Sequence, residues 1–396
     1  MYLRELTLDH FRSYEHLSLA LEPGLTLVLG DNGTGKSNLL EAIYALATTR
    51  SMRASSEGEV IAWDAPMPPI ARVAGTAQRL DGPVSVELAI VARTTPDGSV
   101  VPAKSGAPLT SKRLRANGIP RRASEVIGLI GAVLFTTLDI EIISGSPRGR
   151  RRYLDMMIAQ SDREYARTFS RYDKGLTQRN ALLKRIGEGQ ATASELVQWD
   201  DVVVEGGAMI IAARSAAVRE LASAAATHHR HVAASDPAHV DGLELRYLPA
   251  LGESGLPDDA SREAVAEGMR AAFAVLRGRE IAAGTTLAGP HRDDVAIELS
   301  GRSLAAYGSR AQQRSVALAL RMAEADVLRE RSGESPVLLL DDVFSELDPA
   351  RRAATAEALE DAEQVIVTTA DASAVPGELR EPVASYRVAR GRLTAV

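Results

Sequence analysis

The stretch Gly30-Asp31-Asn32-Gly33-Thr34-Gly35-Lys36-Ser37 carries the pattern GxxxxGK[ST] of a phosphate-binding loop. It follows the apolar run 25–29, which predicts a strand, and it precedes a segment that predicts a helix. In this context the glycines let successive backbone N–H groups converge on phosphate oxygens, and the helix N-terminus adds partial positive charge. We expect the whole stretch from Gly30 to Asn38 to contact a nucleotide, with Lys36 at the β- and γ-phosphates and Ser37 on magnesium. A glycine-rich turn without a ligand is the alternative.

A second motif, Pro336-Val337-Leu338-Leu339-Leu340-Asp341-Asp342, predicts a buried strand that ends in two carboxylates. Such a strand delivers its acids to the carboxyl edge of a sheet, where open α/β sheets bind ligands. We expect Asp341 to hold magnesium through water, and Asp342 to orient or deprotonate the attacking water. An exposed acidic turn is the alternative, and the phosphate-binding loop earlier in the chain weakens it.

A third candidate is Ser309, which precedes a segment with helical periodicity from about 310 to 329. A hydroxyl at a helix start makes an anion site that is able to meet a γ-phosphate. An ordinary N-cap is the alternative and, for this residue alone, the preferred interpretation.

Strand patterns surround the phosphate-binding loop. Residues 1–30 predict two strands separated by a polar turn from Arg12 to Glu15, and the alternating residues 84–90 predict a strand in an antiparallel flank. The segment 66–69 is a predicted loop, and residues 95–122 predict a loop or hairpin.

Helical patterns dominate the middle of the chain. They predict one long amphipathic helix from about 150 to 186, a second from a cap at Ser194 to about 233, and a third from about 261 to 280, with the Pro- and Gly-rich segment 236–257 between them. The two nucleotide motifs lie farther apart than one nucleotide-binding core requires. We therefore expect an α/β fold in which residues 1–150 and 286–396 form a discontinuous head, and residues 151–285 form an inserted helical lobe.

Composition narrows the class of protein. The chain of 396 residues has no cysteine, which excludes disulfides, thiol catalysis and cysteine-ligated metals. Its N-terminus lacks the apolar core of a signal peptide, and its apolar runs are shorter than the ~20 residues of a membrane span. We expect a cytoplasmic protein without a membrane partner. The formal net charge is −6, so any DNA contact requires a local basic patch.

The order of the motifs resembles the ABC-ATPase head, with the phosphate-binding loop, then Ser309-Arg310-Ala311-Gln312, then LLLDD and Phe344-Ser345-Glu346-Leu347-Asp348. Further stretches, in order along nearly the whole chain, resemble the RecF family of repair ATPases. They are Arg50-Ser51-Met52-Arg53, Asn117-Gly118, Gly145-Ser146-Pro147, Arg151-Arg152-Tyr153-Leu154-Asp155, Gln178-Arg179-Asn180 and Gly289-Pro290-His291-Arg292-Asp293-Asp294.

The resemblance implies an ATP-dependent, head-to-head homodimer that uses ATP and Mg²⁺. Ser309 and Gln312 of one subunit would meet the nucleotide held by the other, and Asp348 would belong to the D-loop across the interface. The family recognises duplex, gapped or single-strand/double-strand junction DNA and helps to load RecA with RecO and RecR, in replication, DNA-damage repair and the SOS response. A weak, DNA-stimulated ATPase activity is therefore expected.

Three departures from the family pattern affect these expectations. Ala311 replaces the usual signature glycine, so a methyl group crowds the approach of the backbone to phosphate. Asp342 stands where transporters generally carry glutamate, although the RecF pattern commonly shows this aspartate, and the carboxylate that is one methylene shorter favours slow turnover. Thr137 stands where the family often has proline, in the segment from Phe135 to Asp139 that corresponds to the Q-loop.

Two further features have open interpretations. The basic residues expected to contact DNA, with a solvated face as the alternative, are Lys112, Arg113, Arg115, Arg148, Arg150, Arg151 and Arg152. The last four sit at a predicted helix start, where cations oppose the helix dipole and an anionic partner would relieve the conflict. His291 could act on phosphate, but a structural hydrogen-bonding role is the preferred interpretation.

Two other functions share the nucleotide motifs. One is the nucleotide-binding subunit of an ABC transporter, which the long insertion and the RecF-like stretches disfavour. The other is a scaffold that binds ATP only to dimerise, which the intact Asp341 and Asp342 disfavour. A GTPase or a small-molecule kinase is a weaker possibility, because the chain has no NKxD guanine-specificity motif.

Overall fold

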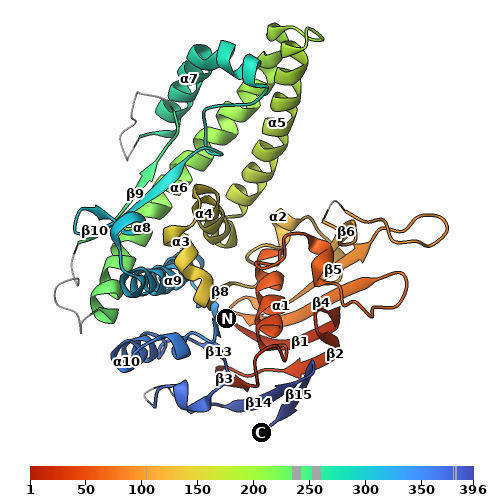
Figure 1. Cartoon of the computed structure of the whole chain (residues 1–396), viewed down its shortest axis with the longest axis vertical. Coiled ribbons are helices and arrows are strands. Elements are labelled where there is room, and N and C mark those ends of the chain that lie inside the picture. Colours follow the sequence, from red (N-terminus) through yellow and green to blue (C-terminus); the bar gives the residue numbers. More distant parts are fainter. Residues whose placement is uncertain (104, 234–241, 252–259, 378, 380) are drawn as a thin grey trace. The chain divides into compact units, whose positions relative to one another are not determined.

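A parallel sheet follows directly from the apolar runs that flank the nucleotide motifs. The computed structural model describes residues 1–103, 105–233, 242–251, 260–377, 379 and 381–396, and its α/β fold is shown in Figure 1. The parallel sheet contains β3 (Gly24–Leu29), β8 (Ala132–Thr136), β12 (Val337–Asp341), β13 (Gln364–Thr369), β14 (Ala384–Ala389) and β15 (Arg392–Ala395). Its order is β15-β14-β3-β13-β12-β8, and only β15 is antiparallel to its neighbour. The central strands are buried on both faces, as a parallel core requires.

A second sheet has the alternating burial of antiparallel strands with one covered face. Its strands are β1 (Tyr2–Phe11), β2 (Tyr14–Ala20), β4 (Ile70–Arg79), β5 (Gly82–Ala92), β6 (Thr110–Ala116) and β7 (Ile119–Pro120), in the order β2-β1-β4-β5-β6-β7. The helix α1 (Lys36–Thr48) contacts strands of both sheets. The antiparallel flank, the strand at 84–90 and a hairpin within 95–122 are confirmed. The two strands predicted in residues 1–30 are confirmed as β1 and β3. The polar turn predicted from Arg12 to Glu15 was wrong in its extent, because Tyr14 and Glu15 open the additional strand β2.

Contacts between Cα atoms divide the chain into two compact units. The first unit contains Met1–Asp139, His228–Pro237 and Leu318–Val396, and the second contains Ile140–Thr227 and Ala238–Ala317. These divisions differ from the predicted boundaries at 150 and 286. The reason is that α3 (Glu141–Ser144), α4 (Pro147–Ser161), α8 (Leu304–Tyr307) and β10 (Asp294–Leu299) contact one another within the second unit.

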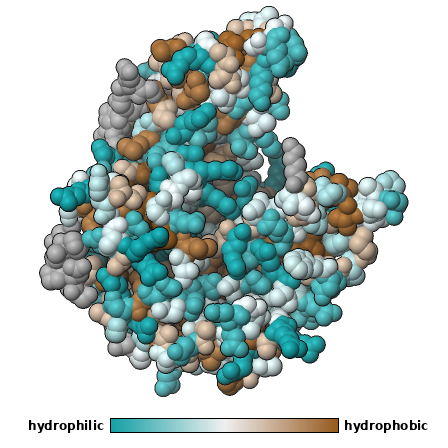
Figure 2. Space-filling model, in the orientation of Figure 1, coloured by the Kyte–Doolittle hydropathy of each residue, from teal (hydrophilic) through white to brown (hydrophobic). Residues whose placement is uncertain are grey.

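The remaining elements complete the two units. The first unit also has α2 (Ala123–Val126), α10 (Pro349–Ala358) and short 3-10 turns at Glu57–Val60, Phe344–Glu346 and Ala372–Ala374. The second also has α5 (Arg163–Gly187), a 3-10 turn at Ala193–Glu195, α7 (Arg262–Ala283), β9 (Leu243–Leu248) and β11 (Arg302–Ser303). A 3-10 turn at Thr137–Ile140, α6 (Leu196–Val232) and α9 (Arg310–Ser332) contain residues of both. On the face shown in Figure 2, hydrophobic residues are scattered among hydrophilic ones.

The helical predictions need two corrections. The single helix predicted over 150–186 is two helices, because Asp162 interrupts it and its carboxylate accepts the Tyr165 amide at 2.9 Å as the N-cap of α5. The cap predicted at Ser194 belongs to Thr192, whose amide donates to the Glu195 carboxylate at 2.9 Å. The third helix is confirmed as α7. Within the segment 236–257, β9 was not predicted, and residues 234–241 and 252–259 lie outside the described residues.

Buried ion pairs connect the helices of the second unit. Arg214, 2% exposed, donates to both carboxylate oxygens of Asp155 at 2.7 and 2.9 Å and to the Pro290 carbonyl at 2.7 Å. The Tyr165 hydroxyl donates to the same Asp155 carboxylate at 2.6 Å. These contacts tie α4, α5 and α6 to the loop before β10.

A second cluster of buried charges surrounds Arg179, which is fully buried. Its guanidinium donates to Asp200 at 2.8 Å and to Glu280 at 2.7 Å, and it lies 4.0 Å from the centre of the Phe273 ring. The cluster joins α5, α6 and α7. Ion pairs and hydrogen bonds to the guanidinium offset the desolvation cost of burying this charge.

We predict that Arg214→Met lowers the free energy of unfolding by about 3–5 kcal/mol, because it leaves the Asp155 carboxylate without its partner in a buried site. Urea denaturation followed by circular dichroism measures the change. Arg148→Met, at an exposed position near the start of α4, is the matched control and should lie within about 0.5 kcal/mol of the wild type. Equal stability of the two variants would refute the role of the Arg214 pair.

Candidate nucleotide site

The parallel register brings the two nucleotide motifs to one edge of the sheet. Strand β13 lies between β3 and β12, and the pairs Thr369 with Leu29 and Thr368 with Asp341 align the three carboxyl ends. The Ser37 hydroxyl therefore donates to the Asp341 carboxylate at 2.9 Å, although the two residues are 304 positions apart. The structure thus brings together the two motifs that the sequence analysis paired, and their roles toward nucleotide and metal stay predictions.

The phosphate-binding loop has the backbone shape that its glycines allow. Gly33 and Gly35 have φ of 80° and 118°, which L side chains rarely adopt. A Cβ on Gly35 would also lie 2.7 Å from the Ser13 hydroxyl. The Tyr14 hydroxyl donates to the Gly35 carbonyl at 2.9 Å and so fixes the loop from the second sheet.

The start of α1 is built to receive an anion. Gly35 is its N-cap, no side chain caps it, and no acidic residue lies in its first turn. The first amide groups of a helix lack partners within the helix, so they remain available to phosphate oxygens at the positive end of the dipole. This arrangement fits the predicted role of the loop.

Three further polar side chains of this segment make hydrogen bonds within the first unit. Lys36 is 6% exposed, and its ammonium donates to the carbonyls of Gly30 and Asp31, the latter at 3.0 Å. Thr34 donates to the Asp31 carbonyl at 2.8 Å, and Asn38 donates to the Ser13 hydroxyl at 2.9 Å. The side chains of Thr34 and Asn38 therefore maintain the loop itself.

Two threonines that sequence analysis missed hold the acidic pair. The Thr368 hydroxyl donates to the Asp341 carboxylate at 2.8 Å, and the Thr368 carbonyl accepts the Asp342 amide at 3.0 Å. The Thr369 hydroxyl lies 3.4 Å from the nearer Asp342 carboxylate oxygen. β-branched residues at the end of a buried strand look like ordinary core, so no signal in the sequence identified them.

The donor set fits magnesium bound together with a nucleotide. Among the described residues, no group of three or more histidine or acidic side chains is arranged to hold a metal by itself. Mg²⁺ bound with a nucleotide typically takes one or two protein oxygens and completes its octahedron with phosphates and water. The hydroxyl of Ser37 and the carboxylate of Asp341, already in contact, supply such a pair.

The segment that corresponds to the Q-loop lies at the same edge. Thr136, the last residue of β8, pairs in register with Asp341, and the exposed Thr137 follows it. The Asp139 carboxylate anchors the turn, because it accepts the Thr136 amide at 2.7 Å and an Arg321 guanidinium nitrogen at 2.6 Å. The assignment of this segment remains a prediction that its position supports.

Ser309 and Gln312 form a reciprocal cap at the start of α9, within the second unit. The Gln312 amide donates to the Ser309 hydroxyl at 3.2 Å, and the Ser309 amide donates to the Gln312 side-chain oxygen at 2.8 Å. The N-cap interpretation is thus confirmed. Ser309 is exposed and Gln312 is half-buried, and a contact of either with the nucleotide of a second subunit remains a prediction. Asp348 is likewise an N-cap, accepting the Arg351 amide at 3.0 Å in α10.

Several of the basic residues assigned to DNA are used inside the fold. Lys112 donates to the Thr49 carbonyl at 2.6 Å and pairs with Glu57, and burial lowers its pKa. Arg150 makes a two-pronged ion pair with Asp294 at 2.7 and 2.9 Å.

Arg151 donates to the Asp293 carbonyl, so the cations at the start of α4 are partly satisfied within the second unit. Arg113, Arg115, Arg148 and Arg152 are exposed. A contact between any of these residues and DNA stays a prediction, and it is weakest for Lys112, Arg150 and Arg151.

His291 has the environment of a structural residue. Burial lowers its pKa to about 4, so the imidazole is neutral near pH 7. The Tyr172 hydroxyl donates to Nδ1 at 2.8 Å, and Nε2 donates to the Thr286 carbonyl at 3.1 Å. Both ring nitrogens are occupied within the second unit, which confirms the structural interpretation.

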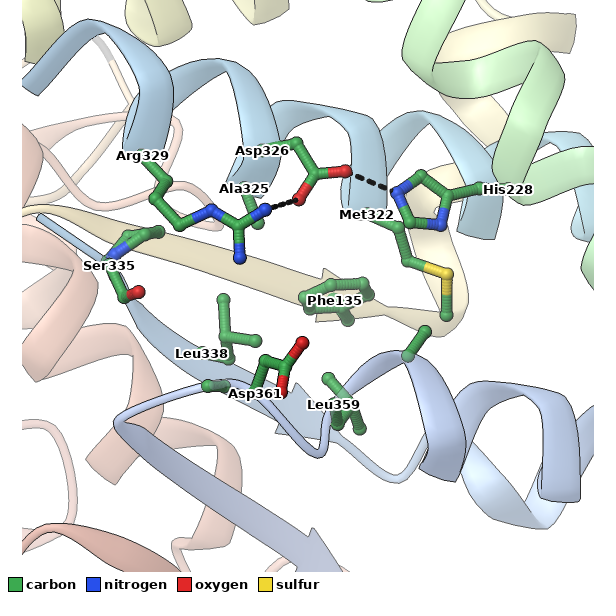
Figure 3. A pocket seen from close by; sticks show the side chains of 13 residues that line it. Phe135, His228, Met322, Ala325, Asp326, Arg329, Ser335, Leu338, Leu359 and Asp361 are labelled. Carbon is green, nitrogen blue, oxygen red and sulfur yellow. Dashed lines mark hydrogen bonds and ion pairs between the residues drawn. The ribbon is translucent and has the colours of Figure 1, made fainter. Parts of the chain in front are cut away.

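A separate pocket lies in the first unit between α9, α10 and β12 (Figure 3). Its floor is apolar, with Phe135, Met322 and Leu338, and at its rim the Asp326 carboxylate accepts from His228 at 2.6 Å and from Arg329 at 3.1 Å. Its lining contains none of the predicted nucleotide ligands.

These features, a phosphate-binding loop after β3, an acidic pair after β12 and a threonine pair on the strand between them, define an ATPase head of the ABC type. A family model described as the RecF/RecN/SMC N-terminal domain matches residues 2–390. The chain belongs to the RecF family of DNA replication and repair proteins.

Relatives of known name match the chain from end to end. The RecF protein of Chloroflexus aurantiacus is 41% identical over 404 residues, with 100% of both chains covered. That of Bacillus subtilis is 34% identical, with 99% of this chain and 100% of the relative covered.

Solved structures give the same result. The structure of the recombination mediator protein RecF with ATP in the RecFOR pathway is 30% identical, with a TM-score of 0.84 over 100% of this chain and 97% of that one. An SMC head bound to the C-terminal winged-helix domain of ScpA, at 17% identity and a TM-score of 0.52, shares the fold. Among the helices that the structure describes, none has the length and apolar character needed to cross a membrane.

We predict that Lys36→Ala weakens ATP binding on the order of 100-fold, because the phosphates lose a charge-assisted donor inside a buried loop. Titration with a fluorescent ATP analogue measures the dissociation constant. Lys174→Ala, an exposed lysine on α5, should bind as the wild type does. If both variants keep wild-type affinity, the loop is not the nucleotide site.

Proposed function

We propose that this chain is an ATP-switched, DNA-binding repair ATPase. It binds ATP with Mg²⁺, closes into a head-to-head homodimer, and hydrolyses ATP slowly with stimulation by DNA. The DNA is duplex, gapped or a single-strand/double-strand junction. With RecO and RecR it helps to load RecA in recombinational repair, replication and the SOS response, which places it in the cytoplasm.

One observation carries the nucleotide part of the proposal: the contact of Ser37 with Asp341 beside an uncapped helix start. Helix amides and Lys36 hold phosphate, and the Ser37 and Asp341 oxygens hold Mg²⁺. The metal supplies charge neutralisation at the β- and γ-phosphates. Asp342, next in sequence to Asp341, orients the attacking water and takes up its proton.

The dimer part rests on the exposed start of α9. Ser309 is solvent-exposed and Gln312 is half-buried, at a helix N-terminus that is suited to an anion. In a closed dimer this terminus would meet the γ-phosphate held by the loop of the partner, so neither subunit would have a complete site. Ala311 would weaken the closure, since its methyl group limits backbone approach.

The DNA and partner parts rest on the family. The related solved protein is described as a recombination mediator of the RecFOR pathway, and the relatives are described as DNA replication and repair proteins. The exposed Arg113, Arg115, Arg148 and Arg152 are the cations from which a phosphate-binding surface would be assembled.

Two alternative functions remain distinguishable. A transporter subunit would be recovered with a membrane partner, and the match to RecF relatives over the full chain disfavours it. A scaffold that binds ATP without hydrolysis would dimerise and release no phosphate. The decisive experiment measures oligomeric state, phosphate release and binding to duplex, single-stranded and gapped DNA, each with and without ATP and Mg²⁺.

We predict that Asp342→Asn slows ATP hydrolysis about 100-fold or more while ATP affinity changes little, because the amide keeps the shape of the carboxylate but cannot take a proton. The ATP-bound dimer should accumulate, as measured by size-exclusion chromatography with light scattering. Hydrolysis at the wild-type rate would exclude Asp342 as the water-activating group.

We predict that ATP controls DNA affinity and its salt dependence. Closing two heads would place the basic residues of both along one surface, so the log–log salt slope should steepen by about 0.9 for each duplex phosphate neutralised. Replacing Arg113 and Arg115 by alanine should flatten the slope without changing sequence preference, because phosphate contacts do not read bases. Fluorescence anisotropy over a salt series measures both.

Two variants make this test specific. Replacing the exposed Arg262 and Arg270 by alanine removes the same charge at positions outside the predicted surface and should leave the slope unchanged. Ser309→Arg should block closure and lower DNA affinity in the presence of ATP. Equal DNA binding with and without ATP, and by the Ser309→Arg variant, would contradict the switched-dimer mechanism.

A further inference from the structure

Strand β13 touches both nucleotide motifs through its last two residues. The Gly30 amide, at the start of the phosphate-binding loop, donates to the Thr369 carbonyl at 3.3 Å. The Asp342 amide donates to the Thr368 carbonyl at 3.0 Å. Both threonines are buried, at 0% and 1% exposure. The end of β13 is therefore a fixed backbone bridge between the two motifs.

The two hydroxyls are divided between the two carboxylates. Thr368 donates to Asp341 Oδ1 at 2.8 Å, and Ser37 donates to the same oxygen at 2.9 Å. Thr369 is the neighbour of Asp342, at 3.4 Å from Oδ1. Each acid thus has its own threonine, and the Asp342 partner is the looser one.

The single proton of the Thr369 hydroxyl has two acceptors to choose from. One is Asp342 Oδ1 at 3.4 Å, and the other is the Asp371 carbonyl at 3.1 Å. The same hydroxyl oxygen accepts the Asp371 amide at 3.2 Å, which holds it in place. A donor that is fixed by one neighbour and shared by two acceptors can rotate toward the carboxylate without moving the strand.

Asp342 needs such support because its backbone does not lie in an ordinary strand conformation. Its φ is 54°, in the left-handed region that few residues other than glycine adopt. The carboxylate therefore projects from a turn, and a donor on one oxygen orients the other.

We infer that Thr369 is a positioning residue for ATP hydrolysis: its hydroxyl orients the Asp342 carboxylate toward the attacking water. This inference rests on the proposed ATPase function. The Thr369 hydroxyl acts through Asp342. The hydroxyl donates its proton in a hydrogen bond and transfers nothing, so the reaction catalysed is unchanged.

Thr369→Val tests the inference, because valine keeps the branched shape and removes the donor. We expect kcat for ATP hydrolysis to fall about 10-fold, with the KM for ATP within about 2-fold of the wild type. The lifetime of the ATP-bound dimer, measured after a chase with unlabelled protein, should lengthen in proportion. Thr369→Ser, which restores the hydroxyl, should recover most of kcat.

Thr26→Val is the matched control. Thr26 is 1% exposed on the neighbouring strand β3, and its hydroxyl has no hydrogen-bond partner among the described residues, so the substitution should leave kcat, KM and dimer lifetime unchanged. Thermal unfolding of each variant separates loss of fold from loss of positioning.

The outcomes separate the inference from the function on which it rests. If the wild type hydrolyses ATP and Thr369→Val matches it in kcat and dimer lifetime, the inference fails alone. Failure of Thr369→Ser to recover kcat, or a rise in KM in place of a fall in kcat, also overturns it. A wild type that releases no phosphate from ATP removes both the proposed function and the inference.

Discussion

The position of β13 between β3 and β12 is the constraint on which the nucleotide site depends. Parallel strands in register end together, so three loops from distant parts of the sequence must meet at one edge. The phosphate-binding loop supplies amides, the loop after β12 supplies acids, and β13 supplies hydroxyls and carbonyls that lock the other two. A slip of one residue in either pairing would separate Ser37 from Asp341 and turn the side chains of β13 to the opposite face.

In the second unit, buried ion pairs specify how the helices pack. Arg214 and Arg179 are buried in separate clusters, and their carboxylate partners come from several helices. Such pairs contribute little net stability, because desolvation offsets most of the attraction. An alternative packing would nevertheless leave a bare charge in a dry interior. The clusters therefore select one arrangement of α4, α5, α6 and α7, and they explain why several RecF-like motifs of the sequence are structural.

Those motifs also show how far the sequence could be interpreted. The phosphate-binding loop, the acidic strand and the helix at 310–329 were predictable, because each combines a hydrophobic period with a polar pattern that has one chemical purpose. The break at Asp162 was not, since a cap inside a continuous apolar stripe looks like an ordinary exposed acid. The strand β2 was missed because Tyr14 was assigned to a turn.

Contacts between residues that are distant in the sequence could not be predicted, for a different reason. Arg150 and Arg151 look like a free basic cluster until Asp294 and the Asp293 carbonyl are seen beside them. Thr368 and Thr369 have no pattern at all, because their role arises only when β12 is laid against β13. A local sequence pattern reflects the secondary structure and exposure that a residue prefers. The roles of these residues depend instead on tertiary contacts with residues distant in the sequence.

The backbone at Asp342 limits which acid the site can use. Aspartate and asparagine are enriched several-fold at positive φ, because a short polar side chain can bond to nearby backbone groups. Glutamate gains no such compensation, so its longer arm would bring strain as well as reach. Exchange of aspartate for the glutamate of the transporters is therefore more than a change of one methylene group. It also adds backbone strain at this position, where the main chain favours the shorter acid.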